Sequence, residues 1–195
     1  DVEPLSADGL LAEGVDRPYF VYAGNASEWH GAEIFARVFE KHWAADKYAQ
    51  LVSLSRIAVP EIQQIADRMR YRAQEENECP PIVFLGNEAP ERAARWQRGA
   101  TASLASVRTG VGYDLAYAIK VLSALAGGTP VIYSGAGLAS ADIKENNLGI
   151  VAESTDDAVM KALQHVFISR EEYEAKWLSQ WVSGNRLIEK QVTLR

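Results

Sequence analysis

Short apolar segments rich in β-branched and aromatic residues recur along the chain, and turn-forming residues separate them. Such segments are typical of buried strands. The pattern predicts strands at residues 19–23, 51–54, 81–85, 100–106, 130–133 and 149–152. Between them, apolar residues recur at spacings of three and four, which is the pattern of a helix. The predicted helices lie at residues 32–45, 60–76, 89–98, 114–126, 140–147, 155–168 and about 170–192.

Strands that alternate with helices form βαβ units, whose crossover helices cover both faces of a parallel sheet. The predicted fold class is therefore α/β, a doubly wound parallel sheet of the Rossmann-like type. Residues 1–18 are polar with two glycines and two prolines, and we expect a linker or tail there. Residues 19–195 are expected to form a single domain. Ligands of this architecture bind outside the carboxyl ends of the strands, so the strand-to-helix turns are where function is sought.

Composition and charge narrow the function classes. With 48% hydrophobic and 24% charged residues among 195, the chain has the composition of a soluble globular protein. A formal net charge of −6 without a basic cluster argues against nucleic acid as a partner. The one cysteine, Cys79, forms no internal disulfide, and no metal site is expected. No apolar run approaches the roughly 18 residues of a membrane span, and the acidic first residues do not resemble a signal peptide, so we expect a cytoplasmic protein.

The turn after the first predicted strand is a candidate anion site. It runs from Gly24 to Gly31 and leads into a helix. Small residues let backbone N–H groups approach an anion, and a helix N-terminus adds positive potential. His30 lies just before that helix, where a cation would meet a phosphate. The alternative is an ordinary turn that carries a surface histidine.

A second turn, Gly135 to Ser140, follows a strand and opens a helix, as a dinucleotide-binding fingerprint does. Glu153 ends the next strand, where an acid that binds a ribose would lie. Ser140 stands in place of the third glycine, and the helix is short. The motif therefore matches the fingerprint only in part, and it leaves a nicotinamide-dependent oxidoreductase as an alternative function.

The predicted helix at residues 114–126 is the most informative element. Lys120 and Ser123 fall on one face, since residues three and four apart align on a helix. Lys120 can neutralise a phosphate near the sheet edge, or it is a solvated lysine at the rim. Another face is expected to join the core; its residues are Leu115, Ile119, Leu122 and Ala126.

Residues 117–132, YAIKVLSALAGGTPVI, resemble the helix–turn–strand signature of group 1 glycosyltransferases (family 4), which runs Lys-x-x-Glu-x-x-Ala-x-Gly-x-Pro-Val. Further segments of the chain match the other motifs of the family's nucleotide-sugar half in the same order. Residues 22–25 and 30–31 resemble its first turn, 83–86 its base-side strand, and 142–151 its Ile-x-Glu-Asn-x-x-Gly-Ile-Val ending. The resemblance covers roughly residues 19–168.

The resemblance implies that the chain is the C-terminal, donor-binding half of a two-domain GT-B glycosyltransferase. Its partner would be an N-terminal acceptor-binding domain absent from this chain, and any membrane contact would come through that domain. The implied reaction retains anomeric configuration, needs no metal and takes a nucleoside-diphosphate sugar as substrate rather than a cofactor. The isolated half would be inactive, and no catalytic residue is assigned to it.

Residue by residue, the resemblance implies a donor site that is split among four segments. Gly24, Asn25, His30 and Gly31 would face the phosphates, and Ala118 and Ile119 would offer amides near the diphosphate. Phe84 and Gly86 would border the base. The remaining site residues are Lys120, which matches the signature lysine, and Ser123, which takes the place of the ribose-binding glutamate.

The chain departs from the family pattern at its charged positions. Ser123 and Leu115 stand where the family often carries two glutamates. His30 stands at the phosphate-binding lysine, and Asn25 at a frequent arginine. These departures leave an alternative of a different class, a non-catalytic nucleotide- or carbohydrate-binding module of glycosyltransferase ancestry.

Overall fold

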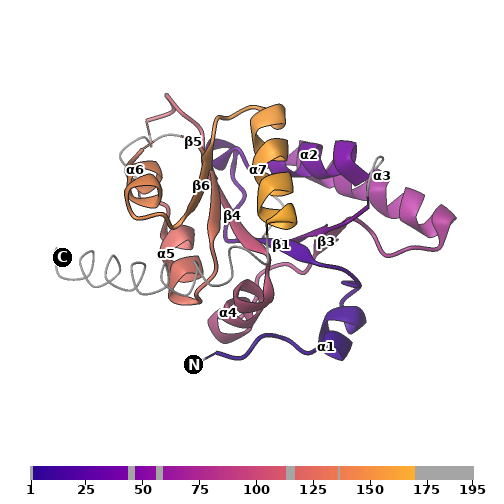
Figure 1. Ribbon diagram of the computed structural model, residues 1–195. Coiled ribbons are helices and arrows are strands. Elements are labelled where there is room, and N and C mark those ends of the chain that lie inside the picture. Colours follow the sequence, from indigo (N-terminus) through magenta and orange to yellow (C-terminus); the bar gives the residue numbers. More distant parts are fainter. Residues whose placement is uncertain (1, 44–46, 56–58, 113–116, 136, 170–195) are drawn as a thin grey trace.

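The computed structural model describes residues 2–43, 47–55, 59–112, 117–135 and 137–169. Six parallel strands form one sheet (Figure 1): β1 Tyr19–Ala23, β2 Gln50–Leu54, β3 Ile82–Phe84, β4 Ala102–Val107, β5 Val131–Gly135 and β6 Gly149–Ala152. The helices are α1 Ala7–Ala12, the 3-10 turn η1 Glu28–His30, α2 Glu33–Trp43, α3 Pro60–Glu76, α4 Pro90–Gly99, α5 Ile119–Ala126, α6 Leu138–Glu145 and α7 Asp156–Ile168.

The strand order is β3-β2-β1-β4-β5-β6, so the direction of winding reverses between β1 and β4. In register, Phe20 of β1 lies opposite Ala102 of β4 on one side and Leu51 of β2 on the other. This order is that of a doubly wound Rossmann-like sheet. The predicted fold class is therefore confirmed.

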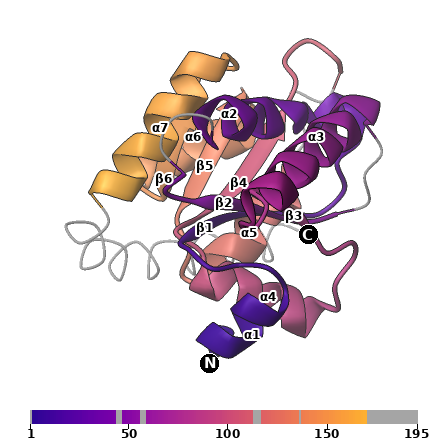
Figure 2. The same ribbon diagram turned by 90° about the vertical axis from the view of Figure 1, so that its right-hand side faces the viewer.

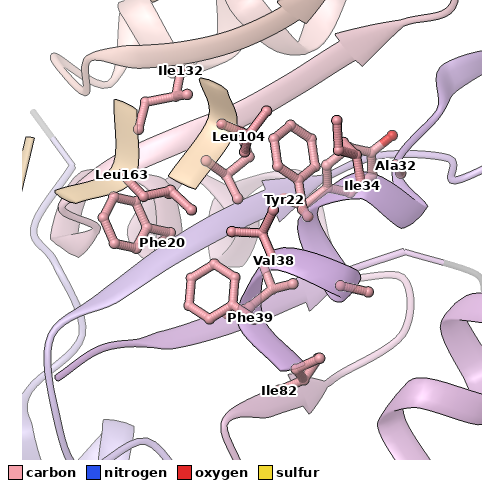
Figure 3. Packing of buried hydrophobic residues seen from close by; sticks show 14 of the residues in the cluster. Phe20, Tyr22, Ala32, Ile34, Val38, Phe39, Ile82, Leu104, Ile132 and Leu163 are labelled. Carbon is pink, nitrogen blue, oxygen red and sulfur yellow. The ribbon is translucent and has the colours of Figure 1, made fainter. Parts of the chain in front are cut away.

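The sheet lies between two helical layers (Figure 2). Helices α2, α3 and α7 cover one face, and α1, α4, α5 and α6 cover the other. Side chains from β1, β4, α2 and α7 meet in the largest apolar cluster, which includes Phe20, Leu104, Val38 and Leu163 (Figure 3). Near-continuous apolar strands are expected where both faces of a parallel sheet are covered.

Most predicted elements are present, and the bounds of three of them, residues 19–23, 60–76 and 149–152, agree with the structure. The helix predicted from Asp114 instead begins at Ile119, and residues 113–116 lie outside the described part of the chain. Its predicted core face is wrong too. Ile119 is 68% exposed, and the buried residues are Val121, Ala124 and Leu125. Because the helix starts later, Ile119 lies in its first turn at the sheet edge.

The N-terminal segment is not a free tail over its described length. Ser6 caps helix α1 by accepting the backbone N–H of Gly9. Val15 is buried, and Leu5 and Leu10 pack with it against the cluster around Trp96 of α4. The expectation of a linker is therefore wrong for this segment, because its apolar residues cover the end of α4. The helix predicted at about 170–192 lies outside the described residues.

At Gly135, strand β5 passes so close to β4 that only a glycine fits. Its φ is +134°, and a Cβ built on it would lie 2.2 Å from the carbonyl oxygen of Val107. The glycine that suggested a dinucleotide fingerprint therefore has a packing explanation in the sheet itself.

Replacing Gly135 with alanine is expected to lower the free energy of unfolding by about 3 kcal/mol or more, since a steric clash adds to backbone strain. Gly14→Ala is the control: its φ is +81°, and nothing lies within 4 Å of the added Cβ. That change should lower the free energy of unfolding by only about 1–2 kcal/mol, the strain of an alanine in the left-handed conformation. Urea unfolding followed by circular dichroism measures both. Equal losses would show that the contact with Val107 is unimportant.

Candidate functional site

In doubly wound sheets, ligands bind in the crevice beside the strand ends where the direction of winding reverses. In this chain that point lies at the carboxyl ends of β1 and β4, since the chain leaves β1 toward α2 and leaves β4 toward α5. The turn after β1 forms one wall. Gly24 begins it with a φ of +125°, and Gly31 ends η1 in the left-handed conformation with a φ of +67°. The N-terminal end of α5, where Ala118 takes the N-cap position, faces this turn.

The side chain of Lys120 crosses from α5 to the turn after β1. Its Nζ donates to the hydroxyl of Tyr22 at 2.7 Å and to the carbonyl of Asn25 at 3.4 Å. Nζ also lies 4.4 Å from the centroid of the Tyr22 ring, within the range of a cation–π contact. A Cβ on Gly24 would lie 3.5 Å from Lys120 Cε, so the side chain passes directly over this glycine. Lys120 is therefore held against the turn and is not a solvated rim lysine.

Burial dominates the electrostatics of this contact. It lowers the pKa of Lys120 from 10.5 to about 7, because the charged amine loses its hydration. Burial also raises the pKa of Tyr22 far above its ordinary range, so the phenol keeps its proton and donates it to the carbonyl of Asn25 at 2.9 Å. The amine therefore changes charge near neutral pH, and an anion beside it would favour the charged form.

His30 is not the cation that its position suggested. Burial, together with the positive charge of Lys120, lowers the pKa of His30 to about 4. Its Nδ1 accepts the backbone N–H of Ser27 at 3.3 Å and lies 2.9 Å from the Ser27 hydroxyl, and its ring stacks on Trp29. Since Nδ1 is an acceptor, the neutral ring carries its proton on Nε2. His30 thus shapes the turn and is uncharged at neutral pH.

Ser123 does not join Lys120 at the turn after β1. Its hydroxyl donates to the carbonyl of Lys120 at 3.1 Å and accepts from Nε2 of Gln97 in α4 at 3.2 Å. Gln97 is buried and also approaches the hydroxyl of Ser103 in β4. The hydroxyl thus links α5 to α4. The position implied for a ribose-binding group serves helix packing in this chain.

The remaining predicted residues lie along the same edge but further apart. Ala118 and Ile119 form the start of α5, opposite the first turn. Phe84 ends β3, and Gly86 follows it with a φ of +73°. Phe84 pairs with Ser53 of β2, which in turn pairs with Tyr22. Two strand spacings, about 10 Å, thus separate the proposed base side from Tyr22.

A polar pocket of about 340 Å³ lies on the α2 side of the crevice. It is bounded by the first turn, by α2 and by the carboxyl ends of β4 and β5; its polar lining includes His30, Glu33, Arg37, Ser106, Arg108 and Ser134. Arg108 forms an ion pair with Glu33, and its Nε donates to the carbonyl of Glu28 at 2.6 Å. The pocket therefore shares the first turn with the Lys120 contact.

The sequence did not single out four residues as members of the site: Tyr22, Glu33, Ser106 and Arg108. Tyr22 is one residue before the end of β1, and Arg108 directly follows β4. Their places at strand ends were a usable signal, because such residues line the ligand edge of a parallel sheet. Glu33 carried no such signal: an acid in the first turn of a helix is usually a solvated partner of the helix dipole.

A sequence comparison decides the family. The model of the family "Glycosyl transferases group 1" matches residues 17–168. The chain belongs to this family. No curated protein sequence matches the chain closely enough to count as a relative.

Solved structures show the same fold. The N-terminal domain of Candida albicans trehalose-6-phosphate phosphatase matches with a TM-score of 0.68 at 15% identity, over 96% of this chain and 44% of that one. Sucrose-phosphate synthase from Thermosynechococcus elongatus matches with a TM-score of 0.61 at 19% identity, over 100% of this chain and 50% of that one. WaaG, a glycosyltransferase involved in lipopolysaccharide biosynthesis, matches with a TM-score of 0.66 at 13% identity, over 88% of this chain and 44% of that one.

At these identities the likeness shows the fold alone, the α/β Rossmann-like fold of GT-B glycosyltransferases. The chain spans half or less of the length of each of these structures. Within the described residues, no helix has the length and apolar character that crossing a membrane requires. Nor do three or more histidine, cysteine or acidic side chains gather there as a metal site.

Replacing Lys120 with methionine is expected to stabilise the fold by about 1–2 kcal/mol at pH 7, since removing a buried charge relieves a desolvation cost. The gain should shrink as pH rises toward about 10. Between the folded pKa of about 7 and the unfolded value near 10.4, the unfolded chain binds a proton that the folded chain does not, so the wild type gains stability with pH.

Thermal and urea unfolding at pH 7 and pH 9.5 measure this difference. Lys161→Met, at an exposed position on α7, is the matched control and should change stability by less than about 0.5 kcal/mol at either pH. A Lys120→Met variant that is less stable than the wild type at pH 7 would contradict the burial argument.

Proposed function

We propose that the chain is the donor-binding half of a retaining, metal-independent glycosyltransferase that takes a nucleoside-diphosphate sugar. The diphosphate lies in the crevice between the turn after β1 and the N-terminal end of α5. The base lies toward Phe84 and Gly86, and an N-terminal acceptor-binding domain completes the active site. The family assignment and the fold support glycosyl transfer, and the contacts of Lys120 support the place of the diphosphate.

The observation that carries the proposal is the direction of the Lys120 side chain. The family's lysine and arginine correspond to His30 and Asn25, neither of which is charged at neutral pH in this chain. Lys120 brings an amine from α5 to the same turn, 3.4 Å from the Asn25 carbonyl. A positive charge at the leaving diphosphate is what the chemistry needs, and here it comes from the opposite wall of the crevice.

The N-terminal end of α5 strengthens this arrangement. Ala118 precedes the helix in extended conformation, and within the described residues its side chain makes no capping hydrogen bond. The first N–H groups of a helix have no partner within the helix, and its dipole favours an anion there. Lys120 lies in the same first turn, so the amides and the amine act on one anion. Together they stabilise the charge that develops on the departing diphosphate.

The pH dependence of binding tests the role of Lys120. Affinity for UDP or GDP should fall by up to about tenfold for each pH unit above 7, because the amine of the free protein loses its proton there. The terminal phosphate, with a pKa near 6, is already ionised in this range. Titration calorimetry from pH 7 to 9 measures the slope.

Lys120→Gln should weaken binding at pH 7 and abolish the slope. His30→Gln, the matched control on the opposite wall, should keep it, since His30 is already neutral. A slope that survives in Lys120→Gln and disappears in His30→Gln would assign the phosphate contact to His30 and overturn the proposal for Lys120.

The chain alone is expected to bind a nucleotide sugar without transferring the sugar to an acceptor. It spans half or less of the matched structures, and transfer requires donor and acceptor to be positioned together. Release of nucleoside diphosphate from a panel of UDP- and GDP-sugars, with and without acceptor sugars, measures this. Repeated turnover by the isolated chain would contradict the two-domain proposal.

A further inference from the structure

The packing of the core fixes the side chain of Tyr22. This residue precedes the last residue of β1 and is 3% exposed. Its ring belongs to the largest apolar cluster and lies beside the ring of Phe35 in α2, with 6.1 Å between the ring centroids. A side chain packed this closely keeps one rotamer. The fold therefore determines where the Tyr22 hydroxyl lies before any ligand arrives.

The hydroxyl of Tyr22 has one proton to donate, and its two partners are arranged accordingly. It donates to the carbonyl of Asn25 at 2.9 Å, a group that can only accept. Its oxygen accepts from Nζ of Lys120 at 2.7 Å, and Nζ also donates to the same carbonyl at 3.4 Å. The amine, the phenol and the carbonyl thus form a closed set of three hydrogen bonds that joins α5 to the turn after β1.

Charge does not hold Lys120 in this place. A lysine has a flexible stem, and its amine normally turns toward water. Within the described part of the chain, the titratable groups that face the half-buried amine are Tyr22 of β1 and His30 of η1, and Glu33 of α2 acts on Tyr22. Burial raises the pKa of Tyr22 far above its ordinary range and, with the charge of Lys120, lowers the pKa of His30 to about 4. Both neighbours are therefore neutral at pH 7, and the hydrogen bonds keep the amine at the turn.

We propose that Tyr22 is a positioning residue for Lys120: its hydroxyl keeps the amine at the turn after β1, where an anionic ligand meets it. The proposal rests on the proposed function, since that ligand is the diphosphate of the donor. Tyr22 acts through Lys120 and not on the diphosphate itself. Without the hydroxyl the amine turns toward water, and ligand binding has to order the side chain again.

Tyr22→Phe tests this role, because it removes the hydroxyl and keeps the buried ring. Calorimetry of the full chain with UDP and GDP at pH 7 should show an affinity about three- to tenfold weaker, the loss expected when one flexible side chain must be ordered on binding. The loss should shrink as pH rises from 7 to 9. The wild type loses its charged amine in this range, whereas an amine turned toward water keeps its proton to about pH 10. A merely structural defect would weaken binding by the same factor at every pH.

Tyr19→Phe is the matched control. Tyr19 lies in the same strand and is 2% exposed. Its hydroxyl also donates to a backbone carbonyl, that of Trp96 in α4 at 2.8 Å. The variant removes the same group from the same strand at a place away from Lys120. It should bind UDP and GDP as the wild type does at every pH.

A double-mutant cycle shows whether Tyr22 acts through Lys120. In a Lys120→Met background there is no amine to position, so Tyr22→Phe should change the affinity for UDP and GDP by less than about twofold. A further loss of about three- to tenfold in that background would assign the phenol a direct contact with the ligand and overturn the positioning role.

The outcomes separate this role from the proposed function. If neither UDP nor GDP binds the wild type, the proposed function fails, and the positioning role fails with it. If a nucleotide binds but Tyr22→Phe keeps the affinity and the pH dependence of the wild type, only the positioning role is overturned. A loss that does not shrink with pH, or one that Tyr19→Phe equals, would overturn it as well.

Discussion

Strands β1 and β4 are neighbours in the sheet, yet the chain leaves them toward opposite faces. Two strand-to-helix connections that diverge in this way cannot fill the space between them with backbone, so a crevice remains at the sheet edge. Every candidate group of the site depends on that divergence. The turn after β1 forms one wall, the start of α5 forms the other, and the polar pocket opens toward α2.

The contact across the crevice links stability to function. Lys120 is half-buried against Tyr22, and this partial burial disfavours its charge. A leucine or methionine at this position would serve folding better, since neither carries a group that needs hydration. An amine whose pKa is near 7 is instead ready to take up a proton when an anion arrives. Sites that bind charge commonly retain such a cost in stability.

The altered charges at the first turn and the burial of Lys120 have one physical explanation. His30 cannot be charged next to a buried amine, because two neighbouring positive charges would both need hydration that the site does not supply. One cation reaches the turn from α5, and the histidine supports the turn through Ser27. The proposed donor site thus combines the two connections that the strand order brings together. The pocket beside α2 lies next to it, and its lining contains Glu33, Arg37 and Arg108 together with several hydroxyl groups.

The amino-acid sequence by itself determined the fold class, most element positions and the family resemblance, because strand and helix periodicity and the segment around Gly128 to Val131 are local patterns. It also singled out Lys120 and the first turn. The start of α5 was misplaced, and so was its core face, since burial of Val121 and Leu125 depends on how the helix packs on β4 and β5. Only the tertiary structure decided that Ser123 bonds to Gln97, that His30 is neutral and that Glu33 meets Ser106 in one pocket. These three facts depend on residues distant in the chain, whose desolvation and pairing arise only when the sheet assembles.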